Sequence, residues 1–231
     1  MNKEGNKEGN KEVKLAIALP LTDDKVHTSF FDSFVLMKKP ASYVYMRPAF
    51  RSSIAEARNN LVQQAIDSNC THILMMDTDQ TYPSDTIQKL LSHNLPVVSA
   101  KVHRRYPPFD HLCMRKEGDK LVLVPDEEIE KCDLVQVDAT GTGCVLYNIS
   151  VFNEIPKPWF QEQIGEDGKP IGEDVGFCYK LKEFGYKVFV DCSIDIGHLA
   201  NLEVNYSTYK LYKALKKAQN NKQKENNQLE E

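Results

Sequence analysis

The chain has 231 residues, 41% hydrophobic and 27% charged, which fits one globular domain with a sizeable core and short polar ends. Its net charge of −4 argues against a nucleic-acid partner, because such partners call for a basic domain. We find no apolar run long enough to cross a membrane, no secretory signal and no CxxC among the six cysteines, so we expect reduced thiols in a cytoplasmic protein.

The first part of the chain alternates predicted strands and helices. Residues 1–12 repeat Asn-Lys-Glu-Gly and predict a disordered tail. We then predict strands at 13–19, 42–46, 72–76 and 96–100, and helices over 28–38, from Ser53 and from Pro83. Ser53 and Glu56 form a capping-box pattern ahead of an apolar stripe. The alternation indicates a mainly parallel sheet with helices on both faces.

The second part changes character. We predict short strands at 121–124, 134–138 and 144–147, a helix over 174–184 ended by Gly185, and strands at 187–190 and 194–198. This pattern predicts an antiparallel addition to the α/β sandwich. We expect one domain over residues 13–212 and a polar tail over 213–231. Residues 209–218 place four lysines around Leu211, Tyr212 and Leu215, which indicates either a frayed basic helix or a segment that docks on an anionic membrane or a partner.

The parallel part contains no glycine between Gly9 and Gly118. A dinucleotide fold, a P-loop and a sugar-activating nucleotidyltransferase each need a glycine-rich loop near the first strand. Here that strand runs into Leu19-Pro20-Leu21 instead. If this domain binds a nucleotide, a metal ion and side chains must therefore bind its phosphates.

Two carboxylates follow the third predicted strand. Asp77-Thr78-Asp79 directly continues the apolar run of residues 72–76, so both carboxylates leave the carboxyl edge of the sheet, where ligands bind. Two hard oxygen ligands suit a Mg²⁺ or Mn²⁺ ion that carries a diphosphate. An acidic strand end that runs into a turn at residues 82–85 explains the same residues without a ligand.

Acidic and imidazole side chains reappear late in the chain. Glu173 and Asp174 open the late helix, where the helix dipole favours acidic residues for structural reasons alone, and Asp174 could also act as a general base. His198 follows the last predicted strand, either as a structural histidine or as a neutral imidazole ligand beside carboxylates.

Basic and aromatic candidates complete the set. Arg58 lies beside the apolar stripe of its helix, which favours a partly buried role, and its guanidinium fork suits phosphate. Lys101 begins a basic loop that continues with His103, Arg104 and Arg105, and this loop either covers an anionic donor or is ordinary charged surface. Trp159, the single tryptophan, could stack on a sugar or pack in the core.

Taken in order, these motifs resemble the glycosyltransferases of the GT-A fold, in the broad family-2-like group. The resemblance covers nearly the whole globular region. It is carried by the first strand ending at Pro20, Arg58-Asn59, Met75-Met76-Asp77-Thr78-Asp79, Gly172-Glu173-Asp174-Val175-Gly176-Phe177, Gly185-Tyr186-Lys187-Val188 and Gly197-His198-Leu199.

The resemblance implies a GT-A α/β/α sandwich that transfers a sugar from a UDP- or GDP-linked donor to an unknown acceptor hydroxyl, with Mn²⁺ or Mg²⁺ as the cofactor. In that family Asp79 and His198 would bind the metal, Asp77 would contact metal or ribose, and Asp174 would be the base of an inverting reaction. On the donor side we also place Pro20, Arg58, Thr78 and Lys101, and on the acceptor side Trp159 and Glu173.

The chain departs from the family pattern in one place. The first strand lacks the usual Tyr-Asn pair after its proline, so the residues that read the base, and the identity of the nucleotide, stay open. A catalytically silent nucleotide-sugar-binding protein and an interaction protein on the same fold are the alternatives.

Overall fold

The computed structural model describes residues 12–21, 25–48, 52–165 and 168–229, with side chains up to residue 217 in the last helix. The predicted disordered tail of residues 1–12 lies outside this range apart from Glu12. The chain divides into a unit that ends at Leu199 and a second unit that begins at Ala200.

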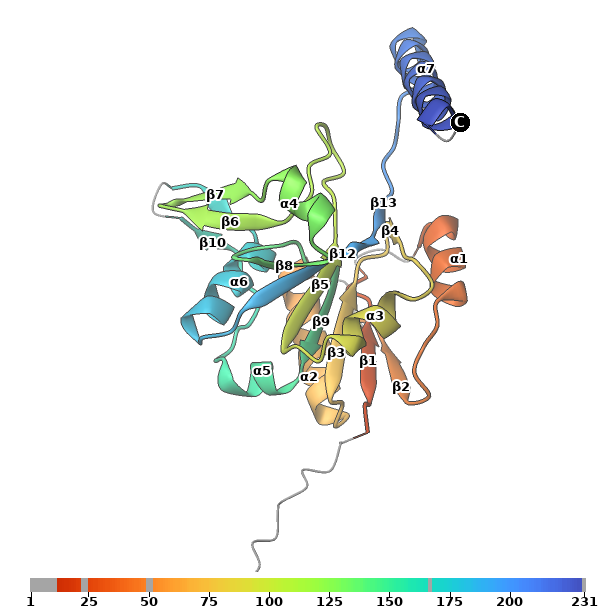
Figure 1. Ribbon diagram of the computed structural model, residues 1–231. Coiled ribbons are helices and arrows are strands. Elements are labelled where there is room, and N and C mark those ends of the chain that lie inside the picture. The colour runs from red at the N-terminus through yellow and green to blue at the C-terminus, as the bar shows by residue number, and fades with distance from the viewer. Residues whose placement is uncertain (1–11, 22–24, 49–51, 166–167, 230–231) are drawn as a thin grey trace, which may run out of the picture. The chain divides into compact units, whose positions relative to one another are not determined.

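A seven-stranded mixed sheet forms the centre of the first unit, in the order β2-β1-β3-β9-β5-β12-β8 (Figure 1). Its strands are β1 (Leu15–Ala18), β2 (Tyr43–Met46), β3 (His72–Met76), β5 (Val97–Lys101), β8 (Leu134–Val137), β9 (Cys144–Asn148) and β12 (Val188–Asp195). β1 is parallel to β2 and β3, and β12 is parallel to β5. β9 is antiparallel to both β3 and β5, and β8 is antiparallel to β12. Five of these seven strands, β1, β2, β3, β5 and β12, therefore run in one direction, and their carboxyl ends share one edge.

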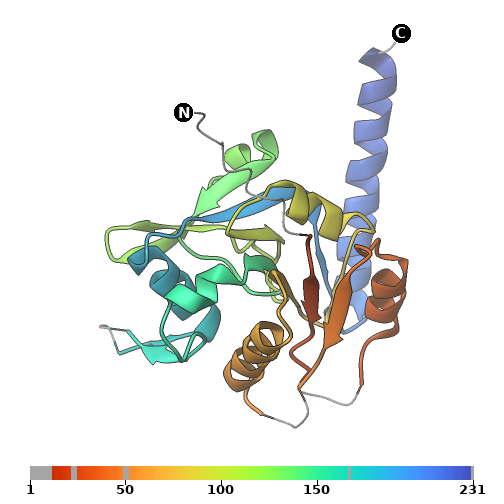
Figure 2. The same ribbon diagram turned by 90° about the horizontal axis from the view of Figure 1, so that it is seen from below.

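Helices cover both faces of this sheet, as Figures 1 and 2 show. Alternate residues of β3 point to opposite faces: Ile73 and Met75 join one buried cluster, and Leu74 and Met76 join another. The first cluster includes side chains from α2 (Ile54–Asp67), α4 (Asp126–Lys131), α5 (Ser150–Glu154) and α6 (Glu173–Glu183). The second includes side chains from α1 (Thr28–Leu36) and α3 (Thr86–Ser92). The predicted α/β/α sandwich is confirmed.

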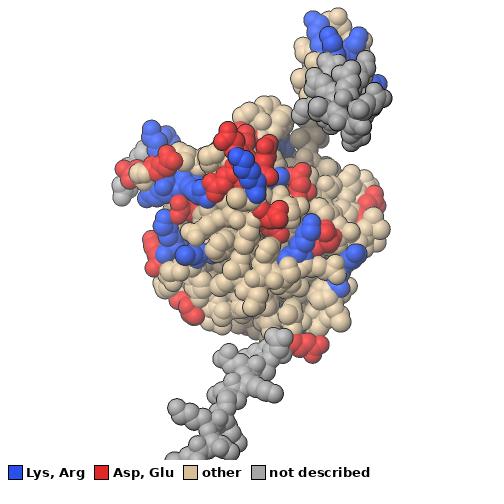
Figure 3. All heavy atoms as spheres, viewed as in Figure 1, with Lys and Arg blue, Asp and Glu red and all other residues tan. Residues whose placement is uncertain are grey.

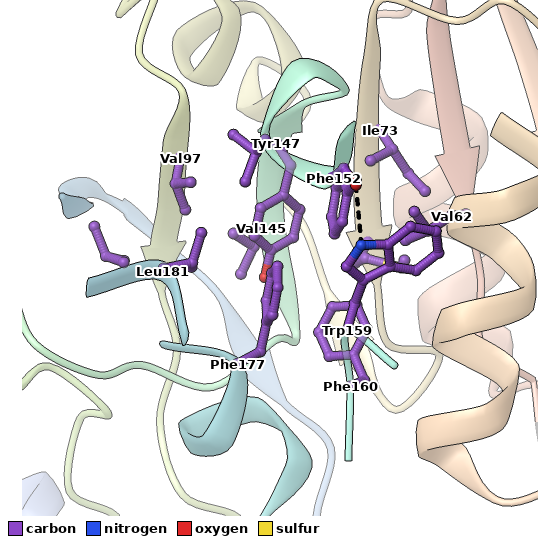
Figure 4. Packing of buried hydrophobic residues seen from close by; sticks show 14 of the residues in the cluster. Val62, Ile73, Val97, Val145, Tyr147, Phe152, Trp159, Phe160, Phe177 and Leu181 are labelled. Atoms are coloured by element: carbon purple, nitrogen blue, oxygen red, sulfur yellow. Dashed lines mark hydrogen bonds between the residues drawn. The ribbon is translucent and has the colours of Figure 1, made fainter. Parts of the chain in front are cut away.

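An aromatic group forms the middle of the first cluster (Figure 4). The rings of Phe160 and Phe177 lie 4.6 Å apart, and Phe152 stacks on Phe177 at 5.4 Å. Trp159 is only 3% exposed, and its indole nitrogen donates to the carbonyl oxygens of Phe152 and Ile155 at 3.0 and 2.9 Å. Of the two readings of Trp159, the structure favours packing in the core, and its acceptor-side role stays a prediction.

Three two-stranded sheets surround the main one. They are β4 (Gln80–Thr81) with β13 (Gly197–His198), β6 (Met114–Glu117) with β7 (Lys120–Leu123), and β10 (Gln163–Ile164) with β11 (Pro170–Ile171). The antiparallel β6–β7 hairpin is part of the predicted antiparallel addition. The β4–β13 pair has a direct consequence for function, because it brings the chain around residue 198 beside the chain around residue 80.

Several element boundaries differ from the prediction. α3 begins at Thr86 instead of Pro83, because the Thr86 amide and hydroxyl both donate to the Pro83 carbonyl and close a turn there. The two late strands predicted at 187–190 and 194–198 are one continuous strand, β12, followed by β13. α2 begins as predicted, with the Ser53 hydroxyl accepting from the Glu56 amide at 3.2 Å.

The second unit contains α7 (Tyr206–Leu229). The predicted boundary after residue 212 falls inside this helix. In the described part of the chain, no helix combines the length and apolar character needed to cross a membrane. All six cysteines are free, and only Cys132 is exposed.

Candidate active site

The backbone after β3 is held in place by β9. The Asp77 amide donates to the Gly143 carbonyl at 3.0 Å, and the Tyr82 hydroxyl lies 2.6 Å from the Asp77 carbonyl and 3.0 Å from that of Gly143. A Cβ atom at Gly143 would collide with the side-chain amide of Gln80, so a larger residue here would displace the buried Gln80 side chain. The Asp77–Asp79 turn is therefore fixed at the carboxyl edge of the sheet.

A buried arginine links this turn to α6. Arg58 of α2 is 4% exposed, and its guanidinium donates to Asp77 at 3.1 Å and to Glu173. Burial raises the pKa of both Asp77 and Glu173, and the Arg58 charge opposes that rise. Arg58 therefore holds two carboxylates from distant segments in one arrangement.

These contacts show what two of the predicted site residues do in the folded chain. Arg58 was expected to bind donor phosphate, but its guanidinium is buried and already engaged by two carboxylates. Glu173 was expected to face the acceptor, but it is buried and pairs with Arg58. In the structure both side chains help to orient Asp77 and the first turn of α6, and their predicted contacts with donor and acceptor stay predictions.

Replacing Arg58 with methionine is expected to lower the free energy of unfolding by about 3–5 kcal/mol, because two buried carboxylates lose their shared cation. Urea denaturation followed by circular dichroism measures this loss. The double variant Arg58→Met/Glu173→Gln is expected to recover part of it, since it removes one of the stranded charges.

Arg115 provides a matched control. It pairs with Glu128 at 2.6 Å, but both side chains are more than a third exposed. Arg115→Met is therefore expected to cost no more than about 1 kcal/mol. If Arg58→Met and Arg115→Met lowered the free energy of unfolding equally, that result would contradict the structural role of Arg58.

The late histidine lies beside the acidic turn. In the β4–β13 pair His198 is opposite Gln80, and the Leu199 amide donates to the Asp79 carbonyl at 2.8 Å. This register places His198 Nε2 3.2 Å from Asp79 Oδ2. Two residues that are far apart in the sequence therefore meet at the sheet edge.

The tautomer of His198 follows from its second contact. Its Nδ1 lies 2.7 Å from the His103 carbonyl oxygen, which can only accept, so Nδ1 carries a proton. In the neutral ring the Nε2 lone pair then faces Asp79, the usual orientation of a metal-binding histidine. The protonated ring instead forms an ion pair with Asp79, and Arg105 Nη1 adds a second pair to the same oxygen at 2.9 Å.

This contact predicts a pH dependence of stability. The hydrogen bond between the two side chains lowers the pKa of Asp79 and raises the pKa of His198. The contact that raises the pKa of His198 stabilises the fold fully below about pH 6.5, the ordinary pKa of histidine. This stabilisation is lost as the pH rises through the pKa of His198 in the folded protein. The contact that lowers the pKa of Asp79 stabilises the fold above about pH 4, the ordinary pKa of aspartate. This stabilisation is lost as the pH falls through the pKa of Asp79 in the folded protein.

In chelator-treated protein, His198→Gln is therefore expected to lower the melting temperature more at pH 5.5 than at pH 9, because only the lower pH lies inside this window. Thermal melts of both proteins across that range provide the measurement. A melting-temperature difference that does not change with pH would contradict the ion pair.

Asp174 lies at the start of α6, and its charge acts on Arg58 together with the charges of Asp77 and Glu173. Its Oδ1 accepts from the Val175 amide at 2.7 Å, and its carboxylate is half-buried. Although burial lowers the pKa of Arg58, the charges of Asp77, Glu173 and Asp174 raise it above its ordinary value. The side chain predicted to be the base therefore belongs to the same charged group as Asp77.

The other predicted donor residues lie along the same edge. Pro20 is buried directly after β1, and Thr78 is half-buried in the acidic turn. Lys101 ends β5, and its Nζ is 3.2 Å from Asp195 at the end of β12. Tyr82 and Gly143 were missed by the sequence reasoning, because no local pattern links residues that far apart.

The described residues include no group of three or more His, Cys, Asp and Glu side chains arranged to hold a metal ion. Asp79 and His198 supply one oxygen and one nitrogen next to each other.

Known proteins resemble the chain in sequence and in structure. Residues 38–119 match the Anp1 family model, a segment that includes Asp77 and Asp79 but not Asp174 or His198. The mannan polymerase complex subunit MNN9 of Candida albicans is 39% identical over 93 residues. That match covers 34% of this chain and 25% of the relative.

The structural matches cover more of the chain. A crystal structure of GalNAc-T7 with UDP, GalNAc and Mn²⁺ matches with a TM-score of 0.59 and 13% identity, over 83% of this chain and 44% of that one. The chain has the GT-A fold. A197 from STIV also matches, with a TM-score of 0.53 and 14% identity, over 84% of this chain and 97% of that one. The GT-A fold inferred from the ordered motifs is thus confirmed, and Asp77, Asp79 and His198 lie at the carboxyl edge of its sheet.

Proposed function

We propose that the protein is a metal-dependent glycosyltransferase that moves a sugar from a nucleotide-diphosphate donor to an acceptor hydroxyl. The contact between Asp79 and His198 at the carboxyl edge of a GT-A sheet carries this proposal. The Anp1 match and the relative in a mannan polymerase complex support it and favour a mannosyl group, donated from GDP or UDP.

Asp79 and His198 would hold the metal through Oδ2 and Nε2. Manganese and magnesium both accept carboxylate oxygen, and manganese also suits imidazole nitrogen. A bound Mn²⁺ or Mg²⁺ would neutralise the negative charge that develops on the leaving diphosphate. The structure of GalNAc-T7, solved with UDP and Mn²⁺, supports this choice of cofactor. Arg105, which contacts the same Asp79 oxygen, would then be released toward the donor phosphates.

The other residues would position the donor and move one proton. Arg58 orients Asp77 for contact with the donor ribose. Asp174 takes the proton of the acceptor hydroxyl as the acceptor oxygen bonds to the anomeric carbon of the sugar. The bond between that carbon and the diphosphate breaks on the opposite side, and the diphosphate leaves with the electron pair. This in-line exchange inverts the anomeric configuration.

A donor screen tests the proposal. GDP-mannose and a set of UDP-sugars are incubated with the full chain in Mn²⁺, in Mg²⁺ or in EDTA, and released GDP or UDP is measured. We expect release from one donor that stops with EDTA. If no donor releases nucleotide and no nucleotide gives a metal-dependent thermal shift, an interaction protein is the better account.

One observation favours a second candidate, a silent nucleotide-sugar-binding protein. Asp79 Oδ2 is already satisfied by Arg105 and His198 without any ligand. Such a protein would bind a donor in the presence of metal and release no nucleotide in the same screen.

A further inference from the structure

The second unit exposes apolar side chains that a folded protein normally buries. Leu211, Tyr212 and Leu215 of α7 are 60%, 66% and 55% exposed. Exposed apolar residues usually lie singly on a protein surface, whereas a contiguous group of them marks an interaction site. Seven large exposed apolar residues fall within residues 202–215: Leu202, Val204, Tyr206, Tyr209, Leu211, Tyr212 and Leu215.

The helix separates Leu211 and Leu215 from Lys210, Lys213 and Lys217. Leu211 and Leu215 are four residues apart and share one face, with Tyr212 beside them. Lys210, Lys213 and Lys217 repeat at three and four residues and lie on the opposite face. The helix is therefore amphipathic, and its polar face is basic.

Two tyrosines lie among the lysines. Lys210 Nζ is 4.7 Å from the Tyr206 ring centroid, and Lys213 Nζ is 5.4 Å from that of Tyr209. Tyrosine combines an apolar ring with a polar hydroxyl, which suits the boundary between water and hydrocarbon. At that boundary the tyrosine rings and the lysine ammonium groups can both contact lipid headgroups.

Charge identifies the kind of partner. From Val204 to Lys224 the sequence contains six lysines and no acidic residue, although the whole chain has a net charge of −4. Figure 3 shows blue atoms and no red ones on the visible, described part of α7. The partner of this segment should therefore be anionic, and it should also offer apolar contact for the leucines.

We propose that α7 binds an anionic membrane surface and lies in its plane, with the leucine face at the acyl boundary and the lysines directed to the headgroups. A coiled coil with a second copy fits less well, because residues 219–228 are only Gln, Asn, Lys and Glu. The apolar face thus covers about three turns, and a coiled coil needs three to four heptads. Nucleic acid would leave the leucine face uncovered.

Vesicle flotation tests this proposal with the full chain. The protein is mixed with vesicles of phosphatidylcholine, or of phosphatidylcholine with phosphatidylserine, and the floating fraction is measured. We expect flotation with the anionic vesicles, little with the neutral ones, and a decrease as salt is added.

Two variants separate the contributions of the helix. Lys210→Gln/Lys213→Gln/Lys216→Gln/Lys217→Gln should weaken binding by roughly fivefold for each lysine removed. Leu211→Gln/Leu215→Gln should weaken it by roughly tenfold for each leucine. Glutamine is a good helix former, so both variants should keep α7, which circular dichroism checks.

A control variant removes the same charge elsewhere. Lys116, Lys120, Lys131 and Lys187 are exposed in the first unit, and their joint replacement by glutamine should leave flotation unchanged. Equal loss in this control, equal binding to neutral vesicles, or no flotation of the unmodified chain would each overturn the proposal. So would self-association in sedimentation that the leucine variant abolishes, because that result assigns the face to a second copy.

Discussion

Replacing Asp79 with alanine is expected to abolish metal-dependent donor binding and to lower the transfer rate by about 10²–10³-fold. The variant removes the oxygen that His198 and Arg105 both contact, and with it one of the two proposed metal ligands. Titration calorimetry with GDP or UDP, in Mn²⁺ and then in EDTA, measures the binding. The fold should survive, because Asp79 is half-exposed and its backbone contact to Leu199 is retained.

Asp85→Ala is a suitable control for this experiment. Asp85 is also acidic and follows β3, but its side chain is 41% exposed and pairs only with Lys89 among the salt bridges of the described residues. It should leave Mn²⁺-dependent binding unchanged. Retained binding in the Asp79→Ala protein would remove Asp79 from the proposed metal site.

Replacing Asp174 with asparagine is expected to leave donor affinity within about twofold and to lower kcat by about 10²–10⁴-fold. An asparagine oxygen can still accept from the Val175 amide, so the start of α6 should keep its geometry. The amide cannot take a proton from the acceptor hydroxyl. Steady-state transfer assays together with donor titrations separate the two effects.

Glu183 at the opposite end of α6 provides the control, since Glu183→Gln removes one carboxylate from the same helix. That variant should turn over at the unmodified rate. A transfer rate in Asp174→Asn equal to that of Glu183→Gln would exclude Asp174 as the base.

Much of the fold could be predicted because its signals are local. β3 spans the predicted residues 72–76, since a short apolar run between turn residues has few alternatives. α2 begins where Ser53 and Glu56 predicted it, because a capping interaction is confined to a few residues. Mostly parallel strands on one sheet likewise follow from alternating strand and helix patterns.

The rest depends on contacts between distant residues. Nothing near Arg58 in the sequence indicates that two carboxylates, 19 and 115 residues away, will enclose it. Composition alone could not decide between core and surface for Trp159, whose indole finds two carbonyl acceptors only after the chain has folded. The approach of His198 to Asp79 was expected from the resemblance to a family, and the β4–β13 register accounts for it physically.

The position of β9 has a consequence for how the molecule folds. β3 and β5 are separated in the sheet by β9, which pairs with both, and the Asp77 amide needs the Gly143 carbonyl. The segment shared with the Anp1 model ends at residue 119, before this strand begins. A fragment of residues 38–119 would lack the strand that pairs with both β3 and β5, so we expect that it does not fold on its own. Because the Asp77 amide bonds to the carbonyl of Gly143, far along the chain, we expect the acidic turn to form late in folding.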